Sequence, residues 1–377
     1  MIRAHRIRLN PTPSQEIYFR KAAGIRRLAY NWGLEQWQRQ YKAGEKPSAL
    51  KLKKQFNAIK REQFPFVYEV TKCAAACAFF DLHDAFQRFF KGLAKYPRFK
   101  SKKRSQDSFG VDNDKFIVGP YWIKLPHIGK VNMAEKLRFK GKILSARITR
   151  SADWWFVSIV VEMPDKKPAP LPDEIVGIDL GLNRLATLSD GSEFENQKPL
   201  RSNLNQLKQL QRSLSRKQKG SKNSEQARRK VARMHYRIGC LREDALQKLT
   251  TQLTTRYRVI VIEDLNVKGM LRNHKLALSL SDAALGRFEE LLKEKAEITG
   301  ARIIQVDRFF PSSKKCHVCG HVKEDLNRSE RVYHCTNPKC GITCDRDYNA
   351  SLNLRREGLR LLGVPEHLRH GSSYDGR

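Results

Sequence analysis

Residues 174–181 read EIVGIDLG, and this short stretch decides which fold the second half of the chain can adopt. It has the apolar character of a strand buried inside an α/β sheet, but a single carboxylate, Asp179, interrupts it. A lone carboxylate buried there would cost several kcal/mol unless it were paired or bound to a metal ion. The position of Asp179 therefore calls for a functional reason.

The segments that follow alternate between strands and helices. A hairpin is predicted at RLATLSDGSEFE (184–195), and two helices with a break near KGSKNS are predicted over 201–255. A second buried strand, YRVIVIEDLN (257–266), precedes a helix at 282–299 and a strand at ARIIQVDRFF (301–310). Three hairpin-linked strands followed by helix, strand, helix and strand form the order of a ribonuclease H-like α/β fold.

Upstream of this region the chain has a different character. The run PDKKPAPLPDE (164–174) is the clearest linker, and we place a domain boundary there. Residues 2–9, IRAHRIRL, predict an edge or half-buried strand, and Thr12 with Gln15 predicts the capping box of a following helix.

A further helix is predicted over residues 70–92. Its aromatic stripe, which includes Phe79, Phe86 and Phe90, is expected to pack in a core rather than to stack on nucleic-acid bases. A basic, turn-rich connector follows at 95–110. The short alternating stretches beyond it predict a small antiparallel barrel or sandwich.

The charge balance points to a polyanionic partner. The 377 residues include 73 Lys and Arg against 39 Asp and Glu, which leaves a net charge of +34. Nucleic acid is the leading candidate, because an acidic membrane surface would be expected to attract cations clustered beside an apolar anchor. No run of 18 apolar residues and no apolar signal segment is present, so a cytoplasmic location is expected.

One region of the chain is nearly free of acids. The predicted helices at 201–239 carry twelve cations against Glu225 alone, and phosphates beside them would relieve the repulsion. These cations are Arg201, Lys208, Arg212, Arg216, Lys217, Lys219, Lys222, Arg228, Arg229, Lys230, Arg233 and Arg237.

Five of the eight cysteines fall in one short stretch, which favours a metal site over disulfides in the cytoplasm. Cys316 and Cys319 form a C-x₂-C pair, and Cys335 and Cys340 form a C-x₄-C pair after fifteen intervening residues. Two such pairs predict a tetrahedral zinc ribbon. The remaining thiol, Cys344, is an alternative to Cys340 as the fourth ligand.

Two more carboxylates stand at positions suited to catalysis. Glu263 ends the VIVI strand, at the edge where α/β sheets gather ligand-binding groups. Asp347 opens the last predicted helix and shares a face with Ala350, Ser351 and Leu354, which are suited to packing on a sheet.

Asp345 is the alternative to Asp347. It would point roughly 200 degrees away from Asp347 if the helix extended that far, and a capping role suits it. Convergent carboxylates in a cationic chain are suited to holding a pair of Mg²⁺ ions that activate a water and stabilise the leaving oxygen of a phosphodiester.

Four motifs together resemble the successive signatures of the TnpB (OrfB) proteins of bacterial insertion sequences, relatives of the type V CRISPR nucleases. They are GIDLGLNRLATLSDG (177–191), VIEDLNVKGM (261–270), FPSSKKCHVCGH (310–321) and CDRDYNASLNL (344–354). The resemblance spans nearly the whole chain, including the YPRFKSKK connector. It implies an RNA-guided DNA endonuclease that uses a transposon-derived guide RNA and cuts double-stranded DNA beside a short adjacent motif.

The resemblance also implies a domain scheme and a set of site residues. The family's three RuvC acids fall on Asp179, Glu263 and Asp347, which would hold two Mg²⁺ ions, and the ribbon would hold one structural Zn²⁺. The protein is expected to act as a monomer on one guide RNA, in the cytoplasm at the nucleoid. The expected parts are a wedge-like β-barrel (1–10 and 96–172), a helical recognition region (11–95), a RuvC-like nuclease domain (173–313 and 345–362), the zinc ribbon (314–344) and a disordered tail (363–377).

Two other functions are compatible with the motifs. An RNA-guided DNA-binding regulator would bind without cutting, although relatives of that kind have lost such acids and this chain retains them. A transposase, or an accessory protein of one, would join transposon ends, but no Tyr-centred strand-transfer motif is identifiable in the sequence.

Overall fold

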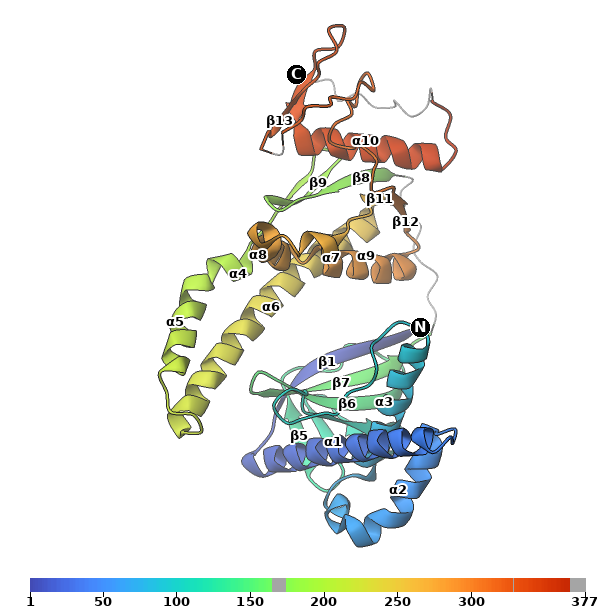
Figure 1. Ribbon diagram of the computed structural model, residues 1–377, viewed down its shortest axis with the longest axis vertical. Helices are drawn as coiled ribbons and strands as arrows, with labels where there is room; N and C mark the ends of the chain where they lie inside the picture. Colours follow the sequence, from blue (N-terminus) through green and yellow to red (C-terminus); the bar gives the residue numbers. More distant parts are fainter. Residues whose placement is uncertain (165–173, 328, 367–377) are drawn as a thin grey trace. The chain divides into compact units, whose positions relative to one another are not determined.

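The computed structural model describes residues 1–164, 174–327 and 329–366. The chain divides into two compact units, an N-terminal unit (residues 1–166) and a C-terminal unit (residues 167–377), which Figure 1 colours along the sequence. The predicted linker at 164–174, apart from its two end residues, and the predicted tail beyond residue 366 lie outside the described residues. Among the helices of the described ranges, none has the length and apolarity needed to cross a membrane.

The N-terminal unit is built on one antiparallel sheet with the strand order β2-β6-β7-β1-β5-β4-β3. Strand β1 pairs with both β7 and β5, and its side chains alternate between exposed and buried. The prediction of a half-buried strand is confirmed, whereas the edge position is wrong. The strands are β1 (Ile2–Asn10), β2 (Ser108–Asp112), β3 (Ile117–Val118), β4 (Trp122–Leu125), β5 (Gly129–Met133), β6 (Lys142–Ser151) and β7 (Trp154–Glu162).

Two details of this sheet differ from the sequence prediction. Strand β2 lies in what was expected to be the end of the basic connector, and it pairs with β6. Strands β2 and β3 form the two ends of the sheet, so the described strands make an open sheet rather than a closed barrel or a two-sheet sandwich. Strand β3 has only two residues, follows a 3₁₀ turn at Asn113–Lys115 and pairs with β4 alone.

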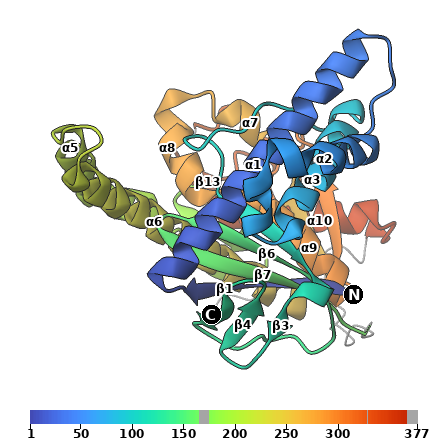
Figure 2. The same ribbon diagram turned by 90° about the horizontal axis from the view of Figure 1, so that it is seen from below.

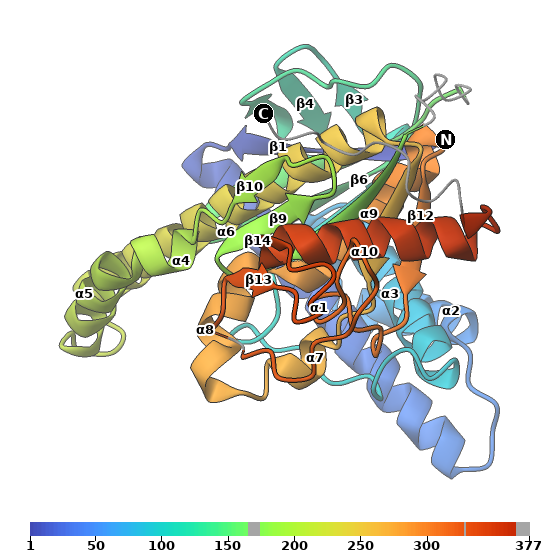
Figure 3. The same cartoon turned by 90° about the horizontal axis from the view of Figure 1, so that it is seen from above.

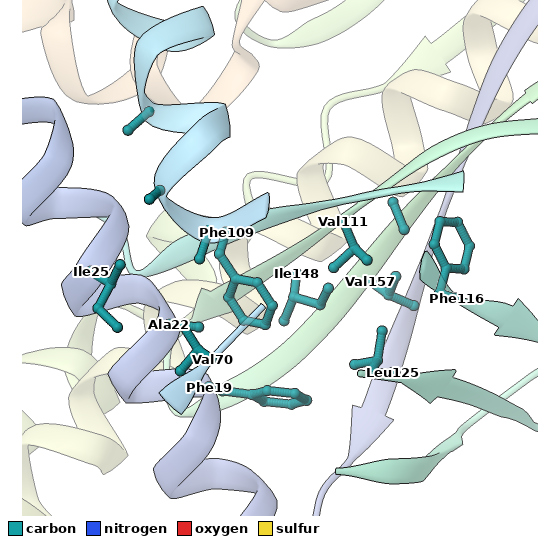
Figure 4. Packing of buried hydrophobic residues seen from close by; sticks show 14 of the residues in the cluster. Phe19, Ala22, Ile25, Val70, Phe109, Val111, Phe116, Leu125, Ile148 and Val157 are labelled. Atoms are coloured by element: carbon teal, nitrogen blue, oxygen red, sulfur yellow. The ribbon is translucent and has the colours of Figure 1, made fainter. Parts of the chain in front are cut away.

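Two helices, α1 (Pro13–Lys42) and α3 (Lys72–Phe90), pack on this sheet, and α2 (Ala49–Gln63) packs on those two helices (Figure 2). The predicted capping box at Thr12 and Gln15 is present at the start of α1. A shared core includes Phe19, Phe109 and Val157, shown close up in Figure 4. The core prediction holds for Phe79 and Phe86, but it is wrong for Phe90, which is 66% exposed.

The C-terminal unit contains a mixed five-stranded sheet in the order β10-β9-β8-β11-β12. Strands β8, β9 and β10 are antiparallel neighbours, whereas β11 runs parallel to β8 and β12 runs parallel to β11. The predicted succession of strands and helices is confirmed. The strands are β8 (Ile175–Leu180), β9 (Arg184–Leu188), β10 (Glu193–Glu195), β11 (Val259–Glu263) and β12 (Arg302–Val306).

Helices lie on both faces of this sheet. Val176 and Ile178 of β8 share one core with α6 and α9, while Val261 packs with Leu354 of α10 on the opposite face (Figures 1 and 3). The helices of this unit are α4 (Pro199–Ser202), α5 (Leu204–Ser215), α6 (Lys222–Arg256), α7 (Val267–Met270), α8 (His274–Ala283), α9 (Leu285–Thr299) and α10 (Arg346–Leu361). A small hairpin of β13 (Val332–His334) and β14 (Thr343–Asp345) precedes α10.

Helix α10 lies unusually close to the sheet, because glycines occupy the points of contact. A Cβ atom on Gly177 of β8 would stand 2.1 Å from the backbone oxygen of Ser351, and one on Gly358 would stand 2.3 Å from Cγ2 of Val261. Ala350, Ser351 and Leu354 are fully buried, as the sequence predicts for the sheet-facing side of this helix. These contacts fix where α10 crosses β8 and β11.

The substitution Gly177→Ala is expected to lower the free energy of unfolding of the C-terminal unit by about 1–3 kcal/mol or more, because backbone cannot yield as a flexible side chain does. Urea or thermal unfolding of the purified chain measures this change. Gly239→Ala is the matched control: Gly239 lies within α6 with nothing within 4 Å of its added Cβ, so stability should stay unchanged or rise. Equal effects of the two substitutions would contradict the close contact at Gly177.

Candidate functional site

Two acids end neighbouring parallel strands. The register of β8 and β11 runs from Ile175 beside Val259 to Ile178 beside Ile262, so the next step brings Asp179 level with Glu263. Because side chains alternate along a strand, Asp179 lies on the same face as Gly177, the face that α10 covers. Both carboxylates therefore sit at one sheet edge beneath α10.

The third acid comes from α10 itself. Asp347 is four residues, about one helical turn, before Ser351, whose backbone oxygen lies over Gly177. This places Asp347 over the carboxyl end of β8, and its side chain is 11% exposed. The structure thus brings together Asp179, Glu263 and Asp347, the three acids singled out from the sequence.

The electrostatics of Asp179 reflect this convergence. Burial raises the pKa of its carboxyl well above the usual range, and the charges of Glu263 and Asp347 add to that rise. Burial likewise raises the pKa of Glu263, which accepts a short hydrogen bond from the Ser312 hydroxyl. The cluster therefore disfavours its own ionised form and would gain from a bound cation.

Ser312 and Asn353 are site residues that sequence reasoning missed. The amide of Asn353, which is buried on α10, donates to the backbone oxygen of Ser312 at 2.8 Å. A second buried amide on α10, that of Asn349, donates to the backbone oxygen of Lys315 at 2.8 Å. The available signal was the placement of two Asn residues on the buried face of α10, where unpaired amides would be costly.

The alternative acid, Asp345, has a different role. Its Oδ1 atom accepts hydrogen bonds from the backbone N–H groups of Asp347 and Tyr348, at 2.9 and 3.0 Å, as the N-cap of α10. Its Oδ2 atom accepts from Arg184 at 2.9 Å. Although burial opposes it, these partners lower the pKa of Asp345. The predicted capping role of Asp345 is confirmed.

Cations stand next to the acidic group. The guanidinium of Arg346 is 3.3 Å from Oδ1 of Asp347, and that of Arg331 is 3.9 Å from Oδ2 of the same residue. The Arg331 side chain is 52% exposed, whereas that of Arg346 is only 17% exposed.

The cysteine cluster has the geometry of a tetrahedral metal site. The Sγ atoms of Cys316, Cys319, Cys335 and Cys340 all lie within 4.8 Å of one another, with Cys316 and Cys340 3.8 Å apart and Cys319 and Cys335 3.6 Å apart. Four thiolates bound to one Zn²⁺ at about 2.3 Å each would stand about 3.8 Å apart. The cluster therefore fits one zinc ion.

The fifth thiol lies outside the cluster. The Sγ atom of Cys344 is 4.0 Å from Nδ1 of His317, and that histidine nitrogen is 2.9 Å from Oδ1 of Asn349. Cys340 is therefore the fourth member, as predicted, and His317 serves as a neighbour rather than a ligand. A hydrogen bond from the backbone N–H of His321 lowers the pKa of Cys319 to about 6, which favours the thiolate that zinc binds.

The carboxylates and the cysteines differ in how tightly they gather. Among the described residues, only the cysteine group meets the 4.8 Å spacing for three or more ligand atoms. A pair of Mg²⁺ ions spans about 3.5–4 Å and keeps several waters, so its carboxylate ligands need not converge on one point. The three acids lie at one sheet edge without meeting that spacing.

The cationic side chains of α4, α5 and α6 are exposed. All twelve Lys and Arg residues singled out between positions 201 and 237 are exposed, and the single acid, Glu225, is paired with Arg228 and Arg229. The two long helices pack on each other through Leu207, Met234 and Ile238. These helices therefore carry exposed cations with a single acid among them, as the sequence predicts.

Comparisons with known proteins show which families this chain resembles. The family model described as "Probable transposase" matches residues 158–274, "Cas12f1-like, TNB domain" matches residues 286–354, and "Helix-turn-helix domain" matches residues 1–46. In the structure, the last of these ranges holds β1 and the single long helix α1.

Several curated relatives align with nearly the whole chain. A Streptomyces pristinaespiralis protein named "Putative RNA-guided DNA endonuclease" is 36% identical over 100% of this chain and 94% of its own length. Similarly named proteins of Mycobacterium tuberculosis strain H37Rv and Escherichia coli K12 are 32% and 29% identical over 94% and 98% of this chain, and over 86% and 96% of their own lengths.

A solved structure shares the fold. The cryo-EM structure of a Cas12f1–sgRNA–target DNA complex matches with a TM-score of 0.54 and 15% sequence identity, over 90% of this chain and 83% of that one. This likeness supports the mixed α/β architecture described above.

Asp179→Asn is expected to make the protein more stable at neutral pH, without added Mg²⁺, by about 1–3 kcal/mol, because the variant no longer has to keep a raised-pKa carboxyl protonated in the folded state. The folded pKa of Asp179 is raised, so unfolding releases a proton above the unfolded pKa of about 3.9. The stability of the unsubstituted protein should therefore fall relative to the variant as the pH rises from about 4.

Urea unfolding across this pH range measures the difference. Asp190→Asn is a control of opposite sign, because the hydroxyl of Tyr257 and the backbone of Ser192 outweigh burial and lower the pKa of Asp190. That variant should be less stable than the unsubstituted protein at every pH above about 4, and the difference should shrink as the pH falls below about 4. A loss of stability in Asp179→Asn at neutral pH would contradict the crowding of carboxylates.

Cys340→Ser is expected to lose most of the bound zinc, whereas Cys344→Ser should keep it, because only Cys340 lies in the cluster. Elemental analysis of the purified proteins gives the metal content per chain. Cys240→Ser, at an exposed position on α6, is the matched control. Zinc loss confined to Cys344→Ser would reverse the ligand assignment.

Proposed function

The chain belongs to the TnpB (OrfB) family of insertion-sequence proteins, and we propose that it is an RNA-guided, Mg²⁺-dependent endonuclease that cuts double-stranded DNA at a single RuvC-like site. The observation that carries this proposal is the meeting of Asp179, Glu263 and Asp347 at one sheet edge of a chain with net charge +34. The names of the relatives support the RNA-guided part of it.

The proposed architecture follows the family. The sheet order β10-β9-β8-β11-β12 supports a ribonuclease H-like nuclease domain formed by residues 173–313 and 345–362, with a zinc ribbon at 314–344 inserted before α10. The N-terminal sheet corresponds to a wedge formed by residues 1–10 and 96–172, and the helices at 11–95 correspond to a recognition region.

In the proposed mechanism the three acids share one role, as ligands of the metal ions. Asp179, Glu263 and Asp347 would hold two Mg²⁺ ions, which together supply an activated water and stabilise the leaving oxygen. The Ser312 hydroxyl orients Glu263, and Asn353 fixes Ser312. Because burial raises the pKa of Asp179 and Glu263, both carboxylates would ionise fully only with a cation beside them.

The proposed partners are a guide RNA from the transposon end and a double-stranded target with a short adjacent motif. The exposed cations of α5 and α6 provide a surface for phosphates, and binding to them should weaken steeply with salt. We propose that one chain acts on one guide RNA, in the cytoplasm at the nucleoid. A binding-only regulator and a strand-transfer protein are the competing functions.

Purified protein with its guide RNA and Mg²⁺ is expected to linearise a plasmid that carries the matched target beside a randomised adjacent motif. Asp179→Ala, Glu263→Ala and Asp347→Ala should each reduce cleavage by orders of magnitude while guide-dependent DNA binding persists, because they remove proposed ligands of the ions. Gel analysis measures cutting, and filter binding measures retention of DNA.

Asp345→Asn is the matched control, because asparagine also caps helices and the residue is only two positions from Asp347. It should retain most of the cleavage activity. Binding without cleavage by the unsubstituted protein would favour the regulator, and joined transposon ends would favour strand transfer. Cleavage that survives Asp347→Ala but not Asp345→Asn would reject the site assignment.

A further inference from the structure

Three aromatic rings of the N-terminal unit form a column that ends at the surface. The ring of Trp37 on α1 stacks on Phe86 of α3, with centroids 3.9 Å apart and planes inclined by 12°. Phe86 in turn stacks on Phe90, with centroids 6.0 Å apart and planes inclined by 25°. Phe86 is 2% exposed, whereas Phe90 is 66% exposed. The column therefore runs from the half-buried Trp37 through the buried Phe86 to the exposed Phe90.

Other aromatic side chains lie beside these rings. Tyr96 meets Phe86 and Phe89 edge-on, with centroids 5.6 and 5.2 Å away. Tyr96 and Phe99 are themselves 42% and 55% exposed. Phe90, Tyr96 and Phe99 are thus three exposed large aromatic side chains within ten residues, whereas single scattered ones are usual on a protein surface.

The chain around this column is strongly cationic. Residues 85–106 contain eight cations and no acid. Seven of the eight side chains are exposed, and Lys100 is half-buried. The cations are Arg88, Lys91, Lys95, Arg98, Lys100, Lys102, Lys103 and Arg104. Aromatic rings interleaved with cations and without acids are the composition of a surface that binds single-stranded nucleic acid.

This basic segment is fixed to the neighbouring helix. Asn31 of α1 donates from Nδ2 to the backbone oxygen of Lys100 at 2.8 Å, and its Oδ1 accepts from the backbone N–H of Lys100 at 2.8 Å. The Lys100 ammonium lies 3.6 Å from the ring centroid of Tyr30. The connector is thus anchored on α1, the helix that also carries Trp37 (Figure 2).

We propose that the exposed face of Phe90 is a stacking platform for an unpaired nucleobase of a nucleic-acid single strand, whose neighbouring phosphates lie on the cations of residues 88–104. This inference extends the proposed function by assigning an unpaired-base subsite to the N-terminal unit. A base would lengthen the Trp37–Phe86–Phe90 column by one ring. A second copy of the chain is a poor occupant, because both surfaces would be cationic in a protein of net charge +34.

The test separates the contribution of base stacking from that of the phosphate charges. Full-length protein, without added Mg²⁺ so that no strand is cut, is titrated against two fluorescently labelled strands of equal length. One strand carries all its bases, and the other has a central run of abasic sites with every phosphate retained. The ratio of the two dissociation constants reports the contribution of the bases, and it is compared between the unsubstituted protein and Phe90→Ala.

The unsubstituted protein is expected to prefer the strand with bases by at least about fivefold, since stacking one base on an aromatic ring contributes about 1–3 kcal/mol. Phe90→Ala should bring the ratio close to one. Phe90→Trp should keep it, and Phe90→Leu, which retains apolar bulk without an aromatic face, should lose it. Leu93→Ala is the matched control, because Leu93 is 69% exposed but carries no ring.

RNA and DNA versions of both strands identify the source of the base. A ratio that is larger for RNA assigns the platform to the guide, a ratio that is larger for DNA assigns it to a displaced target strand, and equal ratios support a site that accepts both. The proposed stacking platform would be wrong if Phe90→Ala left the ratio of dissociation constants unchanged. It would also be wrong if Leu93→Ala lowered that ratio as much as Phe90→Ala does.

The outcome is separable from that of the proposed function. The strand titration needs neither a guide RNA nor cleavage, so a protein that never cuts DNA can still show the base-dependent ratio. Conversely, a cleaving protein whose ratio is insensitive to Phe90→Ala would reject the platform alone.

Discussion

The contact of α10 with the backbone of β8 at Gly177 is the constraint on which the C-terminal unit depends. A helix usually rests on a sheet with a layer of side chains between them, but here the oxygen of Ser351 occupies the space where a Cβ would stand. This contact brings the start of α10 low over the carboxyl ends of β8 and β11. An acid on the first turn of the helix can thereby join two acids that come from strands.

Much of this arrangement could be predicted from the sequence, because it rests on local patterns. The apolar runs at 175–178 and 259–262 predict buried strands, and the small residues at positions 350 and 351 predict the sheet-facing side of α10. The capping role of Asp345 and the membership of Cys340 in the cluster also follow from short-range spacing. These features are set within a few residues of one another along the chain.

The parts that could not be predicted depend on partners distant in sequence. The central position of β1 follows from its pairing with β5 and β7, which lie more than a hundred residues away. Ser312 contacts Glu263 and Asn353, which lie 49 and 41 residues away along the chain. The exposure of Phe90 likewise reflects where α3 ends. A helical stripe of aromatic residues does not indicate which of its members lies at an exposed helix end.

The buried amides of Asn349 and Asn353 have a consequence for how the protein responds to metals. Both donate to backbone oxygens of residues 312–315, directly before the first zinc-cluster cysteine, while Ser312 holds Glu263. The acidic group and the cysteine cluster therefore share one hydrogen-bonded support on α10. A cation that tightened this support at one end would favour the other end by the same free energy, because coupling between two sites is reciprocal.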